Sequence, residues 1–204
     1  MESYDEFIKR LASPSPAPGG GAASAFVSIV SGALVSMVSA LTIGKKGYEN
    51  YYDEIKKIES EVDETTKELR NLMAKDEAAF NILMAAYKLP KGTDEEKKKR
   101  EDEIQKAVKG AIDVPWSIAY KAYDILKLTK FLADHGNKSA ITDTATGALL
   151  SHAAVKAAIY NVRINLKSVK DKDYVADQNI KMKLFLENCD EVYNSVIKTV
   201  EGYL

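Results

Sequence analysis

The chain has very few cysteine and histidine residues. Its 204 residues include one cysteine, Cys189, and two histidines, His135 and His152. A lone cysteine cannot pair within the chain, and no grouping of cysteine and histidine has the spacing of a metal site. The sequence therefore predicts no bound metal, and its cysteine usage is typical of a protein in the reducing cytoplasm.

A net charge of either sign is also lacking. The 29 basic and 30 acidic residues leave a formal net charge of −1. Because general nucleic-acid binding depends on neutralising phosphates, we expect no nucleic-acid partner. The lysine-rich run 97–100 is flanked by acidic residues on both sides, so we interpret it as the solvated face of a helix.

No targeting segment is evident, and only one run is long enough to span a membrane. The first residues are acidic, where a secretory signal would be basic and then apolar. The uncharged run 21–43 has the length of a membrane span, but no second run resembles it and it contains Ser24, Ser28, Ser31, Ser36 and Ser39. We therefore expect no membrane contact and predict a helix that neighbours touch on nearly every side.

The hydrophobic spacing of the chain is helical throughout, without an alternating strand pattern or an internal repeat. It predicts one all-α domain over residues 1–204, a bundle of long up-and-down helices. Two inner helices rich in Ala, Gly and Ser, 21–43 and 140–169, are expected at its centre. The other predicted helices are 3–11, 49–89, 93–133 and 174–203.

Three local signals mark the ends and the interior of these helices. Thr93 and Glu96 have the spacing of a capping box at a helix start. Pro115 must kink the helix that contains it or make that helix restart. Trp116 could stack on a planar ligand, but a single tryptophan in a helix is more often a core residue.

A loop rich in proline and glycine precedes the first long helix. Prolines within 14–18 end the preceding helix, and Gly19, Gly20 and Gly21 expose backbone N–H groups where the next one begins. The positive end of a helix dipole favours an anion. We therefore expect these glycines to bind a carboxylate or a similar anion.

Several blocks of sequence resemble one family closely. They are PAPGGG at 16–21, LTIGKKGY at 41–48, DEAAF at 76–80, AAYKLPK at 85–91, IQKA at 104–107 with Val114-Pro115, and NVRINL at 161–166. In order and spacing the chain is similar to the cyclodeaminase/cyclohydrolase family of folate one-carbon enzymes over nearly its whole length. One block departs: where the family reads GNxxAxSDxG, residues 136–145 read GNKSAITDTA, so Thr142 replaces a serine and Ala145 a glycine.

The resemblance implies an all-helical, oligomeric enzyme that acts on a tetrahydrofolate derivative without a further cofactor. The family hydrolyses 5,10-methenyltetrahydrofolate to the 10-formyl form, or releases ammonia from 5-formiminotetrahydrofolate. The chain carries no formiminotransferase domain, which favours the cyclohydrolase reaction. The competing hypothesis is a non-catalytic helical module that binds folate or a protein partner.

The resemblance and the chemistry together nominate catalytic residues. Lys45 and Asp143 are the first candidates, although a lysine at a helix end and an aspartate in a first turn also serve as dipole partner and cap. Asp76 is a third candidate. It shares a helix face with Tyr87, and both are expected to line one pocket; a satisfied structural acid is the alternative.

The predicted substrate-binding residues are Gly19, Gly20, Gly21, Tyr87, Gln105, Thr142, Asn161 and Asn165. Asn161 and Asn165 lie one helical turn apart and could hold an amide-like pterin edge. Hydrogen bonding between helices in the core is an equally good interpretation of this pair. The three glycines are expected to hold the carboxylates of the folate tail.

Helix geometry separates these residues into two groups. At 1.5 Å per residue, the helix from Gly21 to Lys45 spans roughly 36 Å, and Asp143 lies roughly 27 Å from Asn161. In an up-and-down bundle, Lys45 and Asp143 fall at one end, and the glycines, Asp76, Tyr87 and the asparagines at the other. An antiparallel dimer could bring the two groups together, or an extended folate could link them. We predict a homodimer with the site at or near the interface.

Overall fold

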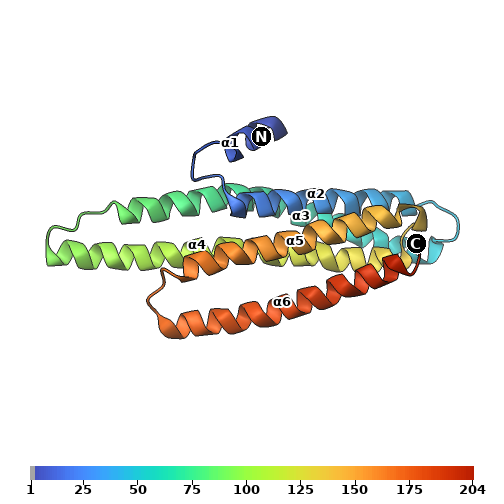
Figure 1. Cartoon of the computed structure of the whole chain (residues 1–204). Helices are drawn as coiled ribbons and strands as arrows, with labels where there is room; N and C mark the ends of the chain where they lie inside the picture. Colours follow the sequence, from blue (N-terminus) through green and yellow to red (C-terminus); the bar gives the residue numbers. More distant parts are fainter. Residues whose placement is uncertain (1–2) are drawn as a thin grey trace.

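The computed structural model describes residues 3–204, which form helices and no strands (Figure 1). This confirms the predicted all-α fold, while the first two residues of the predicted domain 1–204 lie outside the described part. The α-helices are α1 (Tyr4–Leu11), α2 (Gly20–Thr42), α3 (Tyr52–Tyr87), α4 (Asp94–His135), α5 (Ile141–Leu166) and α6 (Lys172–Glu201). Two short 3₁₀ helices, Glu49–Tyr51 and Lys138–Ala140, precede α3 and α5.

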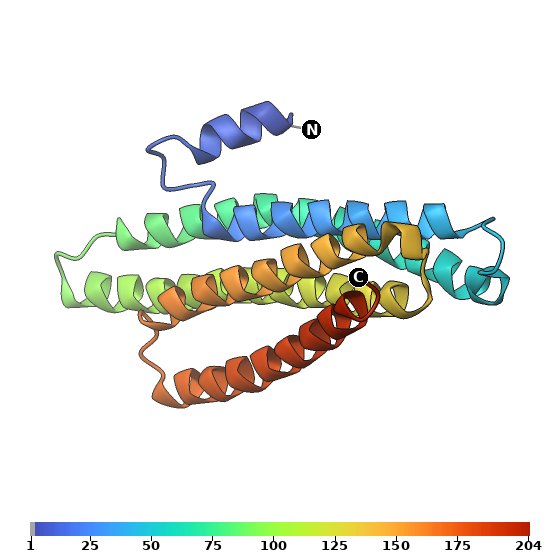
Figure 2. The same cartoon turned by 45° about the vertical axis from the view of Figure 1, so that its right-hand side comes forward.

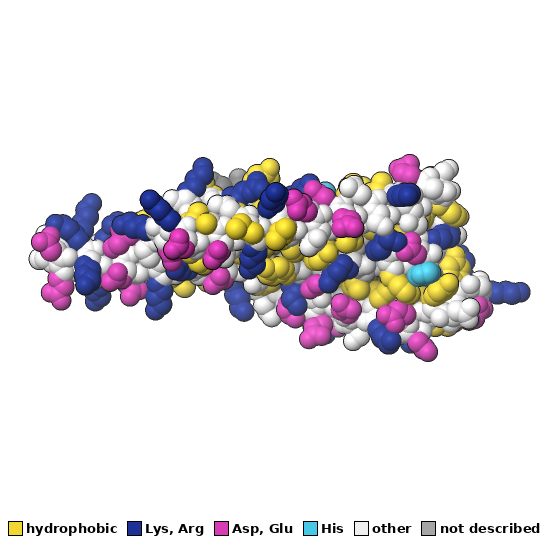
Figure 3. Space-filling model, turned by 90° about the horizontal axis from the view of Figure 1, so that it is seen from below, with side chains coloured by type: hydrophobic (Ala, Val, Ile, Leu, Met, Phe, Trp, Pro, Cys, Tyr) yellow, Lys and Arg dark blue, Asp and Glu magenta, His cyan; other side chains and the backbone are white. Residues whose placement is uncertain are grey.

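Helices α2 to α5 run up and down as a four-helix bundle (Figures 1 and 2). α3 and α4 are longer than their neighbours, and their connected ends project beyond α2 and α5 as a hairpin. Seen from below, basic and acidic side chains cover this projecting hairpin, while hydrophobic side chains gather over the broader part (Figure 3). α6 packs against α4 and α5, and α1 stands beside α2 and α3.

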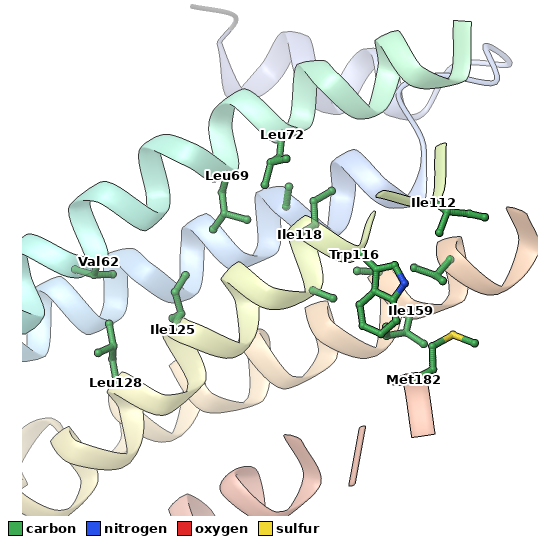
Figure 4. Close-up of a cluster of buried hydrophobic side chains, with 14 of the residues drawn as sticks. Val62, Leu69, Leu72, Ile112, Trp116, Ile118, Ile125, Leu128, Ile159 and Met182 are labelled. Carbon is green, nitrogen blue, oxygen red and sulfur yellow. The ribbon is translucent and has the colours of Figure 1, made fainter. Parts of the chain in front are cut away.

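The main core lies between α3 and α4 and extends to α5 and α6 (Figure 4). Val62 and Leu69 of α3 are fully buried, as is Ile125 of α4. Apolar residues three and four positions apart place one stripe of each helix toward this core, and their burial supplies most of the driving force for folding.

Small residues allow α2 to pack closely against α3 and α5. A Cβ at Gly32 would overlap the side chain of Thr66, and the hydroxyl of Ser31 donates to the carbonyl of Gly147 at 2.6 Å. Within residues 3–204, α2 is the one helix that is long and apolar enough to cross a membrane by length and composition. Its serine hydroxyls instead serve packing inside the bundle.

One side of α2 and of α5 remains open, which differs from the expectation that these helices are surrounded. Ser31 and Gly147 mark the line of contact between the two helices. Successive residues of an α-helix are rotated by 100° about its axis. Val30, next to Ser31, and Thr146, next to Gly147, are therefore both turned away from the contact line, toward the same side of the bundle. The exposed residues at helical spacing from these two lie on that side. We call this surface the α2–α5 face; its apolar members are Val30, Ala33, Met37, Leu41, Leu149, Ala153, Tyr160 and Ile164.

The local signals on α4 have different outcomes. The capping box of Thr93 and Glu96 is present, and Trp116 is buried with its indole N–H donating to Gln178 at 2.7 Å. Of the two alternatives for Pro115, a kink or a restart of the helix, the structure excludes the restart, because α4 continues from Asp94 to His135 with the proline inside it.

Candidate functional site

The start of α2 meets α3 and α5 at a group of four residues: Gly20, Gly21, Asp76 and Asn161. We call this the aspartate group. Asp76 reaches from α3 and accepts a hydrogen bond of 3.0 Å from the backbone N–H of Ala22. A Cβ at Gly21 would overlap the Asp76 carboxylate, and one at Gly20 would lie 3.3 Å from the amide nitrogen of Asn161. The two glycines thus permit the close approach of both side chains.

Asp76 has the electrostatic setting of an acid–base group. Burial raises the pKa of its carboxyl above the ordinary value, and the charge of Glu77 raises it further. The hydrogen bond from Ala22 acts in the opposite direction without cancelling the effect of burial. A carboxyl whose pKa is shifted toward neutrality can both accept and return a proton, which is the property required of a general base.

The glycine loop does not present an empty anion site. The carboxylate of Asp76 already accepts from one of the backbone N–H groups at the α2 N-terminus, where the helix dipole favours negative charge. Gly19 is the N-cap and has an extended backbone. That the glycines hold the substrate's carboxylates stays a prediction, and a side chain of the protein already uses one N–H group of this site.

A second group lies where α2 ends and α5 begins. We call Lys45, Asn137, Ser139 and Asp143 the lysine group. The ammonium of Lys45 donates to Oδ1 of Asn137 at 2.6 Å and to the Ser139 hydroxyl at 3.2 Å. The backbone N–H of Asn137 in turn donates to the Thr42 hydroxyl at 2.9 Å. These contacts fix the turn 136–140 against the end of α2 and hold Lys45 at the surface.

Asp143 and Thr142 lie in the first turn of α5, directly after the loop 136–140. Thr142 is exposed and Asp143 is half-buried. Lys45 and Asp143 form no ion pair in the described part of the chain, so their charges are available at the same end of the bundle without neutralising each other. This placement agrees with the predicted division into two ends.

Three predicted site residues lie outside both groups. Tyr87 is eleven residues beyond Asp76, about 16 Å further along α3, and lies at the start of the hairpin tip with 37% of its surface exposed. That Asp76 and Tyr87 line one pocket therefore stays a prediction, which requires a substrate that spans this distance. Gln105 donates to the carbonyl of Ser168 and accepts from the backbone N–H of Lys170, which ties the α5–α6 loop to α4.

Asn165 also serves the fold. Its amide donates to the carbonyl of Ala111 at 2.6 Å. Ala111 is four residues before Pro115, and proline has no N–H to offer that carbonyl. Asn165 therefore supplies the missing donor, whereas its neighbour Asn161 donates to Ala157 on its own helix and touches the aspartate group.

Asn137 is the site residue that the sequence prediction did not include. It is buried, with 6% exposed, and its side chain joins Lys45, the backbone of Ser139 and the carbonyl of Leu41. A signal was present, because Asn137 belongs to the 136–145 block that resembles the family. No group of three acidic, histidine or cysteine side chains in residues 3–204 could hold a metal ion.

The sequence and the fold both match known proteins. The formiminotransferase-cyclodeaminase family model matches residues 3–184. The chain is 34% identical to the methenyltetrahydrofolate cyclohydrolase of Methylorubrum extorquens over 98% of this chain and 97% of that protein. It is 31% identical to the formimidoyltransferase-cyclodeaminase of Gallus gallus over 96% of this chain, which corresponds to 36% of that longer protein.

A solved structure shares the arrangement of helices. The crystal structure of the formiminotetrahydrofolate cyclodeaminase from Thermotoga maritima matches with a TM-score of 0.85 and 33% identity, over 98% of this chain and 96% of that chain. The fold and the matched sequences define a helical enzyme of the folate one-carbon class. The chain belongs to the formiminotransferase-cyclodeaminase family, which confirms the resemblance seen in its sequence blocks.

Proposed function

We propose that this protein hydrolyses 5,10-methenyltetrahydrofolate to 10-formyltetrahydrofolate. The observation that carries the proposal is the aspartate group, in which a carboxyl of raised pKa lies beside two glycines and an amide. The relative from Methylorubrum extorquens, which the chain matches over nearly its full length, bears the name of this activity. The reaction changes no oxidation state, so we propose that tetrahydrofolate itself is the only cofactor.

The chemistry requires a base and an acid around one carbon atom. Water adds to the methenyl carbon between N5 and N10, and Asp76 takes the proton that the water releases. The bond from the tetrahedral carbon to N5 then breaks, the electron pair stays on N5, and N5 takes a proton from an acid. The hydroxyl left on the carbon releases its proton to solvent and becomes the formyl carbonyl, so that the whole reaction releases one proton. Lys45 supplies the proton that N5 takes, and Asp143 lies at the same end of the bundle.

The aspartate and lysine groups must come together for this chemistry. Within one subunit they are separated by most of α2, about 32 Å from Gly21 to Thr42. The α2–α5 face runs between them and exposes apolar side chains such as Tyr160, of which 66% is accessible. We propose an antiparallel homodimer through this face, in which the lysine group of one subunit meets the aspartate group of the other.

Mixed dimers test the shared site. Lys45→Ala and Asp76→Ala are each expected to be inactive, because each lacks one half of the site. Mixing the two variants after dissociation should restore about a quarter of full activity, since random pairing leaves one intact site in half of the dimers. No recovery on mixing, with dimers shown to exchange, would contradict the shared site.

The absorbance of methenyltetrahydrofolate in the near ultraviolet tests the reaction itself. The wild-type protein is expected to remove this absorbance, and Asp143→Asn to slow its removal by about 100-fold or more. Asp63→Asn, which changes an exposed acid of α3, is the matched control and should leave the rate unchanged. Unchanged absorbance with wild-type protein would contradict the cyclohydrolase proposal.

A cyclodeaminase is the second candidate, since the solved structure from Thermotoga maritima carries that name at 33% identity. Release of ammonia from 5-formiminotetrahydrofolate, without hydrolysis of the methenyl compound, would favour it. If the protein turns over neither folate, a binding module is the remaining hypothesis. We propose the cytoplasm as the place of action, on the basis of the single unpaired cysteine.

A further inference from the structure

A cleft of about 410 Å³ lies beneath α1, where α1 stands off α2 and α3. This volume falls within the range of about 300–1,000 Å³ that is usual for small-molecule sites. Phe7 of α1 is buried against Phe26 of α2, with ring centroids 5.2 Å apart. Arg10 near the other end of α1 pairs with Glu77 of α3 at 2.6 Å. α1 thus supplies one wall of the cleft, and Figures 1 and 2 show this helix standing above α2.

Aromatic side chains form part of the walls of the cleft. Tyr4, Phe7 and Phe26 line it, together with the thioether of Met73. Tyr4 lies 5.8 Å from Phe26 at a tilt of 32°, and 63% of Tyr4 is exposed. Aromatic rings and methionine sulfur favour the edges and faces of another ring. The lining therefore suits a flat aromatic group.

A positive charge stands on the wall of the same cleft. Arg70 of α3 lines it and forms no ion pair with any residue from 3 to 204, in contrast to Arg10. A guanidinium binds a carboxylate through two parallel hydrogen bonds. This interaction is strongest where apolar groups exclude water. The cleft therefore suits a ligand that joins an aromatic ring to a carboxylate.

The cleft lies next to the aspartate group. Ala22 lines the cleft, and its backbone N–H is the one that binds Asp76. Glu77, which also lines the cleft, is the next residue after Asp76. A ligand whose reacting end lies at Asp76 can therefore extend past the start of α2 and beneath α1.

We propose that this cleft binds the p-aminobenzoyl-glutamate part of the folate substrate. The benzoyl ring lies among the aromatic side chains of α1 and α2, and a glutamate carboxylate binds Arg70. α1 acts as the cover of this part of the substrate. The proposal takes its ligand from the proposed function, but the cleft can be tested separately.

The direct test is a titration of the full chain with p-aminobenzoyl-glutamate, followed by ligand-observed NMR. Arg70→Gln should weaken binding by about tenfold, the equivalent of one charge-assisted hydrogen bond. Lys67→Gln is the control, because Lys67 lies one turn away on α3 and pairs with Asp63 outside the cleft. Phe26→Leu keeps the apolar volume but removes a ring, and it should also weaken binding. Equal binding by the Arg70 and Lys67 variants, or no binding by the wild type, would overturn the proposal.

Steady-state kinetics distinguish a failure of the cleft proposal from a failure of the proposed function. Arg70→Gln should raise KM for methenyltetrahydrofolate about tenfold and leave kcat within about twofold, because the tail is bound equally before and during the reaction. Probe binding that depends on Arg70, in a protein that turns over neither folate, would contradict the proposed function and support the cleft. Turnover with an unchanged KM in the variant would contradict the cleft and support the function.

Discussion

The carboxyl of Asp76 is subject to two opposed electrostatic influences. As a partner of the Ala22 N–H at the start of α2 it is most effective when charged. Burial and the neighbouring Glu77 favour its protonated form instead. The carboxyl is thus held between its two states, and small changes around it are expected to alter both stability and catalysis.

Gly21 leaves the space that the carboxylate of Asp76 occupies. In Gly21→Ala the new Cβ would overlap the carboxylate of Asp76, so that side chain must leave the α2 N-terminus. We expect a loss of about 1–2 kcal/mol in unfolding free energy, as for a lost helix cap, together with most of the activity. Urea unfolding and the methenyl absorbance assay measure the two effects.

Gly110→Ala is the matched control for this substitution. Nothing lies within 4 Å of a Cβ at Gly110, and alanine is the better helix former by about 0.8–1 kcal/mol. This variant should therefore be more stable than wild type. A Gly21→Ala protein that equals wild type in stability and rate would show that Asp76 does not depend on the space beside it.

The raised pKa of Asp76 also predicts a pH dependence. The native state keeps this proton over a range in which the unfolded chain has released it. The stability that this group contributes is therefore complete below the ordinary pKa of 3.8 and is lost as pH rises through the higher native pKa. Asp76→Asn cannot ionise, so it should gain stability relative to wild type across that window.

Urea unfolding at a series of pH values from about 3.5 to 7 measures this difference. Asp63→Asn, on the same helix but exposed, provides the comparison. A stability difference between wild type and Asp76→Asn that stays constant with pH would exclude a shifted native pKa.

Among the elements, α4 shows how a helix of 42 residues passes through a proline without a break. Pro115 leaves the carbonyl of Ala111 without its usual donor, and Asn165 of α5 donates to it. The proline and the asparagine therefore act as a pair. The hydrogen bond from Asn165 to the carbonyl of Ala111 also fixes the register of α5 against α4.

A double-mutant cycle tests this pairing. Asn165→Ala should cost about 1–3 kcal/mol in unfolding free energy, because it leaves a carbonyl without a partner. In a Pro115→Ala background the restored N–H can bond to Ala111, and the same asparagine change should cost much less. Thermal or urea unfolding of the four proteins gives the coupling energy. Additive effects would mean that Asn165 does not compensate for the proline.

The same pair shows what could be predicted from the sequence. Helix ends follow from neighbouring residues, so the capping box of Thr93 and Glu96 was recognisable. The donor for Ala111 stands 54 positions away, and local spacing contains no information about such a partner. Family blocks located Asp76, Asn161 and Lys45, but only the packed structure distinguished Asn161 at the aspartate group from Asn165 in the bundle.

For the whole molecule, the proposed dimer contact through the α2–α5 face would allow the two groups to form one site. Ala153→Glu would place an unpaired charge at the centre of this face in the proposed dimer. We expect the dissociation constant of the dimer to rise by at least about 100-fold, equivalent to roughly 3 kcal/mol, with loss of activity. Sedimentation velocity measures the assembly state.

Ile82→Glu is the matched control for this variant. Ile82 is 61% exposed on the projecting part of α3, away from the α2–α5 face, so its replacement should leave both dimer and activity intact. A fully active monomer of Ala153→Glu would contradict the shared site. It would then follow that each subunit joins the two groups by another route.

The contact between Ser31 and Gly147 also has a consequence during synthesis. These residues are 116 positions apart, and a ribosome adding 5–20 residues per second needs roughly 6–23 s to make that stretch. During this interval α2 has left the ribosome without α5, although it has the length and composition of a membrane span. The nascent chain thus exposes its most apolar helix early, which makes it a natural substrate for chaperones that bind near the exit tunnel.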